Sequence, residues 1–250
     1  MKSYIPFSIF ILLFFSCQKD VQINGGSMVG TGGSLARFAI VGDMMYVVTT
    51  DSLKTYNIAN TLDPRLVNGQ RIGWNEGGEI ETIFAFNNRL FVGSRTGLFI
   101  YSFKTGNIPK YEGQYEHING CDPVVANDSL AFVTIRNGRT CSNLLAQVNE
   151  LIVLDVKDIN YPKPLKHYPM TYPAGVGLDG KTLFVCDDGI RIFDISTPLS
   201  MTQLKYLPKI DALDVIPSKG TLLIIGEKKL TQLDYRDLNN IKTISEFDLR

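Results

Sequence analysis

The stretch Thr182–Ser196, TLFVCDDGIRIFDIS, decides the fold of this chain. It contains a run of β-forming residues, a short acidic turn with Gly189, and a second β-forming run that ends in Asp194. Two apolar runs of this length, separated by a turn of this composition, predict a β-hairpin.

The same hairpin pattern occurs in four other places along the chain. Three copies are continuous, namely Met45–Ala59, Leu90–Phe103 and Leu222–Tyr235. One copy is interrupted, with Ala131–Ile135 as its first run and Glu150–Val156 as its second. The intervals between copies are 45, 41, 52 and 39 residues, counted between Tyr46, Phe91, Phe132, Phe184 and Leu223. A period of this size indicates a repeat architecture.

Each repeat also predicts two further strands, one before the hairpin and one after it. The preceding strands are expected at 36–41, 81–86, 123–126, 175–178 and 213–216, and each of them ends in polar turn residues. The following strand comes after Pro64, Pro109, Pro164 or Pro198 in four of the repeats. Proline cannot donate to a strand ladder, which places this strand at an outer edge.

Four strands a repeat and five repeats predict an all-β chain folded as a five-bladed β-propeller of units of about 40 residues. A solenoid or a sandwich is the alternative, although no terminal repeat has the composition of a solenoid cap. The propeller is expected over residues 35–250, with the first blade packed against the fifth. Its expected blades are 35–73, 79–119, 120–171, 172–210 and 211–250.

The composition excludes some classes of partner. Lys and Arg total 25 and Asp and Glu total 25, so no basic field exists to attract nucleic acid. The two histidines, His117 and His167, stand at different phases of their repeats, and no Cys/His spacing fits zinc. We therefore expect no cofactor, no metal and no nucleic acid partner.

Residues 1–16 have the pattern of a secretory signal peptide. Lys2 precedes the apolar run Ile5–Phe15, which is too short to cross a bilayer. Cys17 follows Phe14-Phe15-Ser16, which resembles a bacterial lipobox with Phe14 in place of the usual leucine. In a lipobox the cysteine is acylated and becomes the mature N-terminus. The alternatives are cleavage by an ordinary signal peptidase, with Cys17 as a plain thiol, and a transmembrane helix.

Residues 17–34 are then the lipidated cysteine and a glycine-rich tether. Gln18-Lys19-Asp20 resembles the charged tag of surface-exposed lipoproteins of the Bacteroidota. This resemblance implies a lipid anchor in the outer membrane and exposure at the cell surface.

The repeats themselves resemble a known family. ELIVLDV (150–156) and IRIFDIS (190–196) are similar to the LVIVD repeat of bacterial surface β-propellers. GCDPVV (120–125) and LFVCDDG (183–189) are similar to the Bacteroidota lipoproteins of that family. The family implies a secreted, cell-surface propeller without a defined activity.

The aspartates that end the second hairpin run are interpreted as structural. Asp155, Asp194 and Asp234 recur at one position of the repeat, which predicts side-chain hydrogen bonds to the backbone of the following turn. Asn57 stands at the same position in the first repeat.

The face that carries the links between blades is the expected ligand-binding face. Trp74 and Tyr172 lie in such links, and exposed aromatic residues of this kind anchor binding partners. Trp74 could instead pack between two blades. The candidate ligand-facing residues are Trp74, Glu81, Arg95, His117, Asp122, Arg139, Tyr172 and Asp187.

Two functions remain open from the sequence. The first is a lipoprotein, at the cell surface or facing the periplasm, whose propeller is a binding or scaffolding module for a protein or glycan ligand. The alternative is a carbohydrate-active or other hydrolytic enzyme that uses carboxylates at the mouth of the channel. This second function requires that Glu81, Asp122 and Asp211 converge on one pocket.

Three cysteines remain if Cys17 is lipidated, and a secreted protein is expected to join an accessible pair. Cys121 precedes the inner strand of the third blade, and Cys141 lies in the insertion between its second and third strands. Both connections belong to the same face, so we predict a Cys121–Cys141 disulfide. The rival pairing is Cys121 with Cys186. Otherwise Cys186 is expected to be a small buried residue.

Overall fold

The computed structural model describes residues 32–72, 79–103, 107–116, 123–136 and 148–249. These residues form five antiparallel sheets of four strands each, and every sheet has its strands in sequence order. The prediction of an all-β chain with five four-stranded blades is therefore confirmed.

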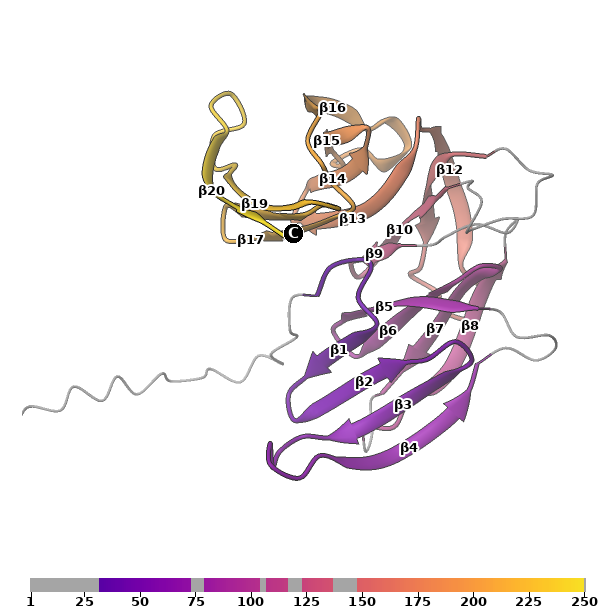
Figure 1. The fold of residues 1–250 in the computed structure, drawn as a ribbon. Helices are drawn as coiled ribbons and strands as arrows, with labels where there is room; N and C mark the ends of the chain where they lie inside the picture. The colour runs from indigo at the N-terminus through magenta and orange to yellow at the C-terminus, as the bar shows by residue number, and fades with distance from the viewer. Residues whose placement is uncertain (1–31, 73–78, 104–106, 117–122, 137–147, 250) are drawn as a thin grey trace, which may run out of the picture.

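Each blade is built from one sequence repeat (Figure 1). Blade 1 consists of β1 (Phe38–Val41), β2 (Met44–Val48), β3 (Ser52–Asn57) and β4 (Arg65–Arg71). Blade 2 consists of β5 (Ile80–Phe86), β6 (Arg89–Ser94), β7 (Gly97–Ser102) and β8 (Lys110–Glu116). Blade 3 consists of β9 (Val124–Ala126), β10 (Leu130–Ile135), β11 (Glu150–Asp155) and β12 (Lys163–Pro169). Blade 4 consists of β13 (Pro173–Asp179), β14 (Thr182–Asp187), β15 (Gly189–Asp194) and β16 (Thr202–Pro208), with a short 3-10 helix at Pro198–Ser200. Blade 5 consists of β17 (Asp214–Ser218), β18 (Thr221–Ile225), β19 (Lys229–Asp234) and β20 (Lys242–Asp248).

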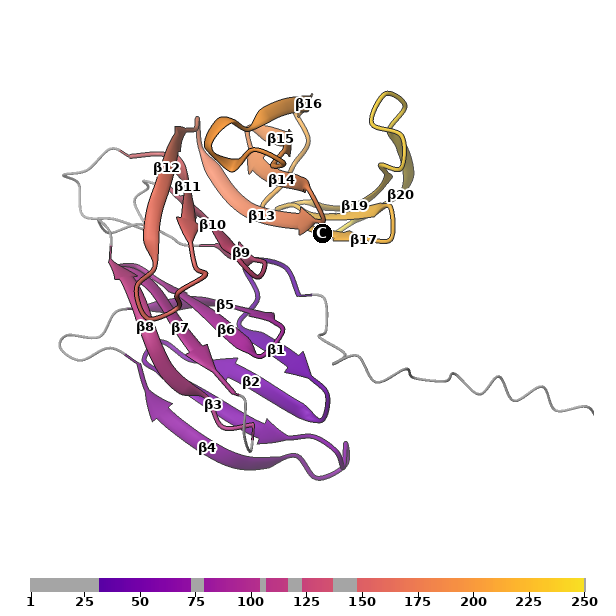
Figure 2. The ribbon, with the colours of Figure 1, turned by 180° about the vertical axis from the view of Figure 1, so that it is seen from behind.

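The first strand of each blade lies on the inside of the propeller. Contacts join β1 to β5, β5 to β9, β9 to β13 and β13 to β17, so successive blades are neighbours (Figures 1 and 2). Backbone hydrogen bonds between inner strands strengthen two of these junctions. The Ile83 N–H donates to the Ala36 carbonyl at 2.8 Å, and the Gly175 N–H donates to the Leu213 carbonyl at 2.7 Å.

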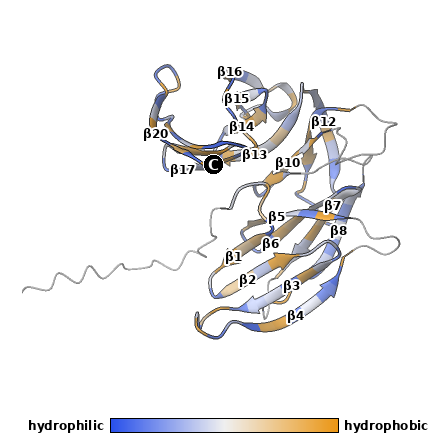
Figure 3. Ribbon diagram, in the orientation of Figure 1, coloured by the Kyte–Doolittle hydropathy of each residue, from blue (hydrophilic) through white to orange (hydrophobic). Residues whose placement is uncertain are grey.

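The core lies between the faces of adjacent blades. The aligned aromatic residues Tyr46, Phe91, Phe132 and Phe184 are all fully buried. Outer strands are polar by comparison, and Figure 3 shows the contrast between the hydrophobic middle strand β10 and the hydrophilic outer strand β12. The buried aromatic positions of the sequence repeat are thus the positions that hold neighbouring blades together.

The predicted role of the repeated aspartates is also confirmed. One oxygen of Asp155, Asp194 and Asp234 accepts the N–H two residues later, at 3.0, 2.8 and 3.1 Å. Asn57 accepts the Ala59 N–H at 2.9 Å in the same way. An amide oxygen can make this turn as well as a carboxylate oxygen can, which explains why the first repeat tolerates asparagine.

One expectation about proline needs correction. Pro164 does not lie in the connection before an outer strand; it lies inside β12, opposite Leu154. The register of β11 and β12 shifts between Val153 and Leu154, and this bulge accommodates a residue without an N–H. All five blades have a register shift between their third and fourth strands.

The described residues of blade 1 and blade 5 meet less extensively than those of the other neighbouring blades. Among the described residues, the inner strands β1 and β17 approach each other less closely than the inner strands of the other neighbouring blades. The connection runs through Ser34 and Leu35, which hydrogen-bond to the side chain of Asp214. Leu223, the fifth member of the aligned set, is only half-buried.

In the described part of the chain no helix is long and apolar enough to cross a membrane. The predicted signal peptide and residues 17–31 of the predicted tether lie outside the described residues.

Candidate functional site

The candidate site is the end of the molecule where each outer strand continues into the next inner strand. We call it the link face and define it by Glu79, Arg95, Arg136, Tyr172 and Asp187, which lie at strand ends or links on this side. The up-and-down order of every blade brings these links and the turns between second and third strands to the same end.

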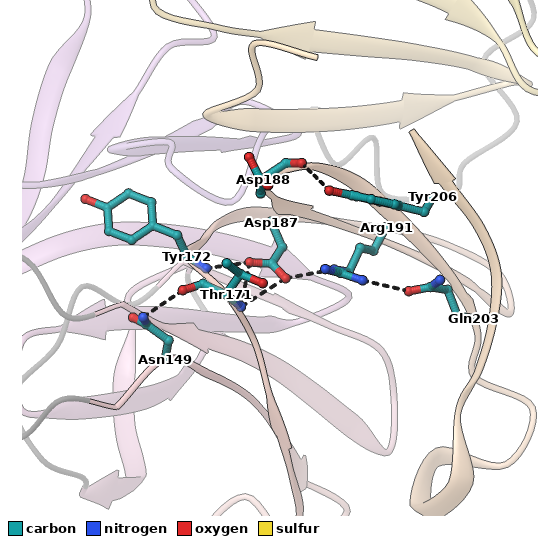
Figure 4. A network of polar contacts seen from close by, with 8 residues as sticks. All are labelled: Asn149, Thr171, Tyr172, Asp187, Asp188, Arg191, Gln203 and Tyr206. Atoms are coloured by element: carbon teal, nitrogen blue, oxygen red, sulfur yellow. Dashed lines mark hydrogen bonds and ion pairs between the residues drawn. The ribbon is translucent and has the colours of Figure 1, made fainter. Parts of the chain in front are cut away.

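Asp187 is the centre of a polar cluster on this face (Figure 4). It ends β14, and only 1% of its side chain is exposed. One carboxylate oxygen accepts the N–H groups of Thr171 at 2.9 Å and Tyr172 at 2.6 Å, and the other accepts Nε–H of Arg191 at 2.8 Å. Burying a carboxylate costs free energy unless hydrogen-bond donors replace the lost water. These three donors replace it here.

Arg191 extends the cluster across blade 4. Its Nη1 donates to Gln203 Oε1 at 3.1 Å, and its guanidinium lies 4.5 Å from the ring centroid of Tyr206. The Tyr206 hydroxyl donates to the carbonyl of Asp188 at 2.7 Å, which fixes the turn after β14 (Figure 4). The outer strand, the turn and the link are therefore joined into one rigid unit.

Tyr172 is the group that this unit presents to solvent. Its side chain is among the exposed large hydrophobic residues, with 52% exposure. The guanidinium of Arg136, at the end of β10, lies 4.8 Å from the centroid of its ring. Asn149 Nδ2 donates to the Thr171 carbonyl at 2.8 Å and ties the link to blade 3 as well. An exposed aromatic ring is thus held in place from two blades, next to a cation.

The other described candidates are distributed around the face. Arg95 forms an ion pair with Glu79, with an N–O distance of 2.8 Å, in the second blade. Glu81 is half-buried in β5. The structure brings Tyr172 and Asp187 together, and it keeps Arg95 and Glu81 in a different blade.

Asp211, one of the three carboxylates of the hydrolytic hypothesis, serves a turn. Asp211 accepts the N–H groups of Glu227 at 3.1 Å and Lys228 at 2.8 Å, and these hydrogen bonds lower the pKa of its carboxyl group. It borders a surface groove of about 540 Å³ on blade 5, whereas Glu81 belongs to blade 2. Asp187 is equally committed to the backbone of its own link.

Several predicted residues cannot be placed. Trp74, His117, Asp122 and Arg139 lie outside the described residues. The lipidation site Cys17 and the predicted disulfide pair Cys121 and Cys141 lie outside them too. Cys186 is described, and it is buried with a free thiol, as expected. Burial raises the pKa of this thiol well above its usual value.

The two arginines beside Tyr172 and Asp187 were not identified from the sequence. Arg136 directly follows the apolar run of β10, and Arg191 is the one charged residue inside the run IRIF (190–193). A charged residue in an apolar β run indicates an outward position with a partner, and this signal could have identified Arg191. Among the described residues no group of three His, Cys, Asp or Glu side chains is arranged to hold a metal ion.

No family model and no curated protein matches this chain. Solved structures do match. A functionally unknown protein from Desulfotomaculum acetoxidans has a TM-score of 0.65 at 11% identity, over 89% of this chain and 69% of that one. A protein from Lactobacillus plantarum has a TM-score of 0.62 at 12% identity, over 83% and 73% of the two chains. The periplasmic gluconolactonase PpgL of Pseudomonas aeruginosa has a TM-score of 0.59 at 11% identity, over 83% and 68%. At such low identity these likenesses establish the fold alone.

Proposed function

We propose that this chain is a binding module of the bacterial cell envelope, held on the membrane through Cys17 and recognising a protein or glycan ligand with its link face. The observation that carries the proposal is Tyr172, an exposed aromatic side chain held beside Arg136 by the Asp187 cluster. A ring that is already fixed loses little conformational freedom on binding, which favours affinity.

The chemistry of this pair suits the proposed ligands. A tyrosine ring offers a flat apolar surface for a sugar ring or an apolar side chain, and its hydroxyl offers a hydrogen bond. Arg136 adds a cation that can donate to a carboxylate or a hydroxyl group. Tyrosine and arginine are also among the residues that most often dominate binding energy at interfaces.

The hydrolytic alternative has weaker support. Asp187 and Asp211 are each engaged by two backbone N–H groups, an arrangement that serves turn structure. The periplasmic gluconolactonase shares the fold, but 11% identity transfers no activity.

The proposal is tested by comparing wild type with Tyr172→Ala on a glycan array and in a pulldown from envelope extracts. The matched control is Tyr161→Ala, because Tyr161 is 71% exposed in the turn between β11 and β12, at the opposite end of the blade. We expect Tyr172→Ala to weaken the binding that wild type shows by about tenfold or more, and Tyr161→Ala to leave it unchanged. Equal binding by wild type and Tyr172→Ala would contradict the proposal that the link face is the binding surface.

A further inference from the structure

The described residues leave an apolar groove between the first and last blades, which we call the seam. It has a volume of about 600 Å³ and is bordered by Leu35, Phe38 and Ile40 from the start of blade 1 and by Leu213, Ile216 and Ile225 of blade 5. Phe38 is 54% exposed and Leu35 is 40% exposed. Both walls of the seam therefore present apolar side chains.

Comparison with the other junctions shows what the seam lacks. Phe38 occupies the position in blade 1 that Ile83 occupies in blade 2, and Ile83 is only 1% exposed because blade 1 covers it. On the other wall, Leu223 is half-buried, whereas its equivalents Phe91 and Phe132 are completely buried. The walls of the seam are thus ordinary blade faces without a neighbour, and a surface of this kind favours a partner.

The N-terminal end of the described chain enters the seam. Gly32 and Gly33 line the groove. The Ser34 hydroxyl donates to Asp214 at 2.8 Å and accepts the Val176 N–H at 2.7 Å, so this point is fixed to blades 4 and 5. A Cβ atom on Gly33 would collide with the Asp214 carboxylate, which shows how closely the chain approaches blade 5. The described chain therefore begins at the groove, with Gly32.

The residues before Gly32 include apolar side chains that suit the apolar walls of the seam. The segment 21–31, VQINGGSMVGT, has four apolar side chains, Val21, Ile23, Met28 and Val29. No charged residue occurs between Val21 and Ala36, so burial of the segment leaves no unpaired charge. Eleven extended residues span up to about 36 Å, and the five residues of β17 need only about 17 Å. Residues 17–20 remain outside to reach a membrane.

We propose that residues 21–31 lie extended in the seam and place Met28 and Val29 between Phe38 of β1 and Ile216 of β17, so that the tether itself closes the propeller ring. The tether is then part of the fold, and the distance between the lipidated residue and the propeller is set by the few residues before Val21.

The test uses the mature chain with Cys17→Ser, so that the whole tether is present in a soluble protein. A photo-reactive benzoylphenylalanine replaces Val29, and a matched variant carries it in place of Lys19, before the docked segment. We expect cross-links from position 29 to peptides containing Phe38–Ile40 or Leu213–Ile216 of the same molecule, and none from position 19. Cross-links from position 29 to a second copy, or to neither strand, overturn the proposal.

Hydrogen–deuterium exchange supplies a readout that does not depend on the cross-linker. Met28→Asp combined with Val29→Asp is expected to speed amide exchange in β1 and β17 by about tenfold or more, while Gln22→Asp with Asn24→Asp, which adds the same charge at polar positions, has a much smaller effect. Unchanged exchange in the first variant means that the blade faces are covered by something other than the tether, and contradicts the proposal.

Discussion

Asp187 and Asp188 are adjacent and chemically identical, but they have different roles. Asp187 is buried and receives hydrogen bonds from two backbone N–H groups and from Arg191, whereas the side chain of Asp188 is exposed. The carboxylate of Asp187 fixes the link that carries Tyr172, so its loss should affect both stability and binding.

We predict that Asp187→Asn lowers the free energy of unfolding by about 2–4 kcal/mol, because the amide cannot pair with Arg191 and brings two donors to a site that already has three. Urea denaturation measures the change. Asp188→Asn is the control, and it should stay within about 0.5 kcal/mol of wild type because asparagine also tolerates the positive φ of 50° at this turn. A similar loss in both variants would contradict the assigned role of Asp187.

Buried tyrosines give the molecule a predicted sensitivity to alkali. Burial raises the pKa of Tyr46 from 10.0 to about 12, and it raises the pKa of Tyr101 to about 12 as well. Below pH 10 both phenols are neutral in the folded and unfolded chain, and the full stability is present. Between pH 10 and 12 only the unfolded chain ionises, so each tyrosine removes up to about 1.4 kcal/mol of stability per pH unit.

The measurement is the free energy of unfolding between pH 9 and 12. Tyr46→Phe should make its decline with pH less steep. The same variant should lose about 1 kcal/mol at pH 7, because the Tyr46 hydroxyl donates to the Asn107 carbonyl at 3.1 Å. An unchanged slope would show that Tyr46 ionises equally in both states.

At the scale of the element, the junction between β13 and β17 depends on the absence of a side chain at Gly175. A Cβ atom there would lie 2.6 Å from the Cα atom of Asp214 and 2.7 Å from the Leu213 carbonyl oxygen. Both contacts are with backbone, which cannot rotate away as a side chain can.

We predict that Gly175→Ala lowers the free energy of unfolding by about 1–3 kcal/mol through forced separation of the two inner strands. Gly69→Ala in the outer strand β4 is the control, since a Cβ atom at Gly69 meets nothing within 4 Å. Thermal unfolding of the two variants side by side distinguishes a local steric effect from a general cost of replacing glycine in a strand. Equal melting temperatures would refute the close approach at Gly175.

The predicted disulfide also belongs to this scale, because it would fasten the insertion of blade 3. The Thr134 N–H donates to the Pro123 carbonyl at 3.2 Å, so the chain that enters β9 runs beside the chain that leaves β10. Cys121 precedes Pro123 by two residues, and Cys141 follows Arg136 by five. Short segments from neighbouring points can bring the two Cα atoms within the roughly 4.4–6.8 Å that a bridge needs.

Peptide mapping under non-reducing conditions should yield a linked Cys121–Cys141 peptide. A bridge around a loop of this size contributes on the order of 3 kcal/mol, so the Cys141→Ser variant should melt at a lower temperature by several degrees. A free Cys141 thiol in the untreated protein, or a peptide that links Cys121 to Cys186, would refute the pairing.

At the scale of the whole molecule, the proposed lipid attachment at Cys17 would determine where the propeller operates. Labelling with a radioactive fatty acid in the native host should mark wild type and should not mark Cys17→Ala. Multiple acyl chains hold a protein on a membrane stably, so the variant is also expected in the soluble fraction. Equal labelling of both proteins would end the proposal of an anchor at Cys17, without bearing on how the link face binds.

The link face and the seam are independent parts of the whole molecule. Tyr172 lies at the junction of blades 3 and 4, and the seam separates blades 1 and 5. Loss of binding in Tyr172→Ala and loss of protection in the tether variants can therefore be observed separately.

The sequence by itself determined the local and repeated features of this protein. The alternation of apolar residues defines each strand, the turn residues define each hairpin, and Asp155, Asp194 and Asn57 define the turns that follow. These features depend on residues close together in the chain, so the fold class and the number of blades could be read from one sequence.

Only the tertiary structure decided how the blades meet and which side chains become buried. Leu223 and Phe132 occupy the same position of the repeat, but Leu223 pairs with Ile216 at the wall of the seam and is half-buried, whereas Phe132 packs against blade 4 and is fully buried. Asp187 is buried because Thr171, Tyr172 and Arg191 surround it. The adjacent aspartates Asp187 and Asp188 look alike in the sequence, which does not show which of the two is buried. The physical reason is that the angle between blades is set by the packing of whole faces far apart in the chain, and a local pattern does not specify it.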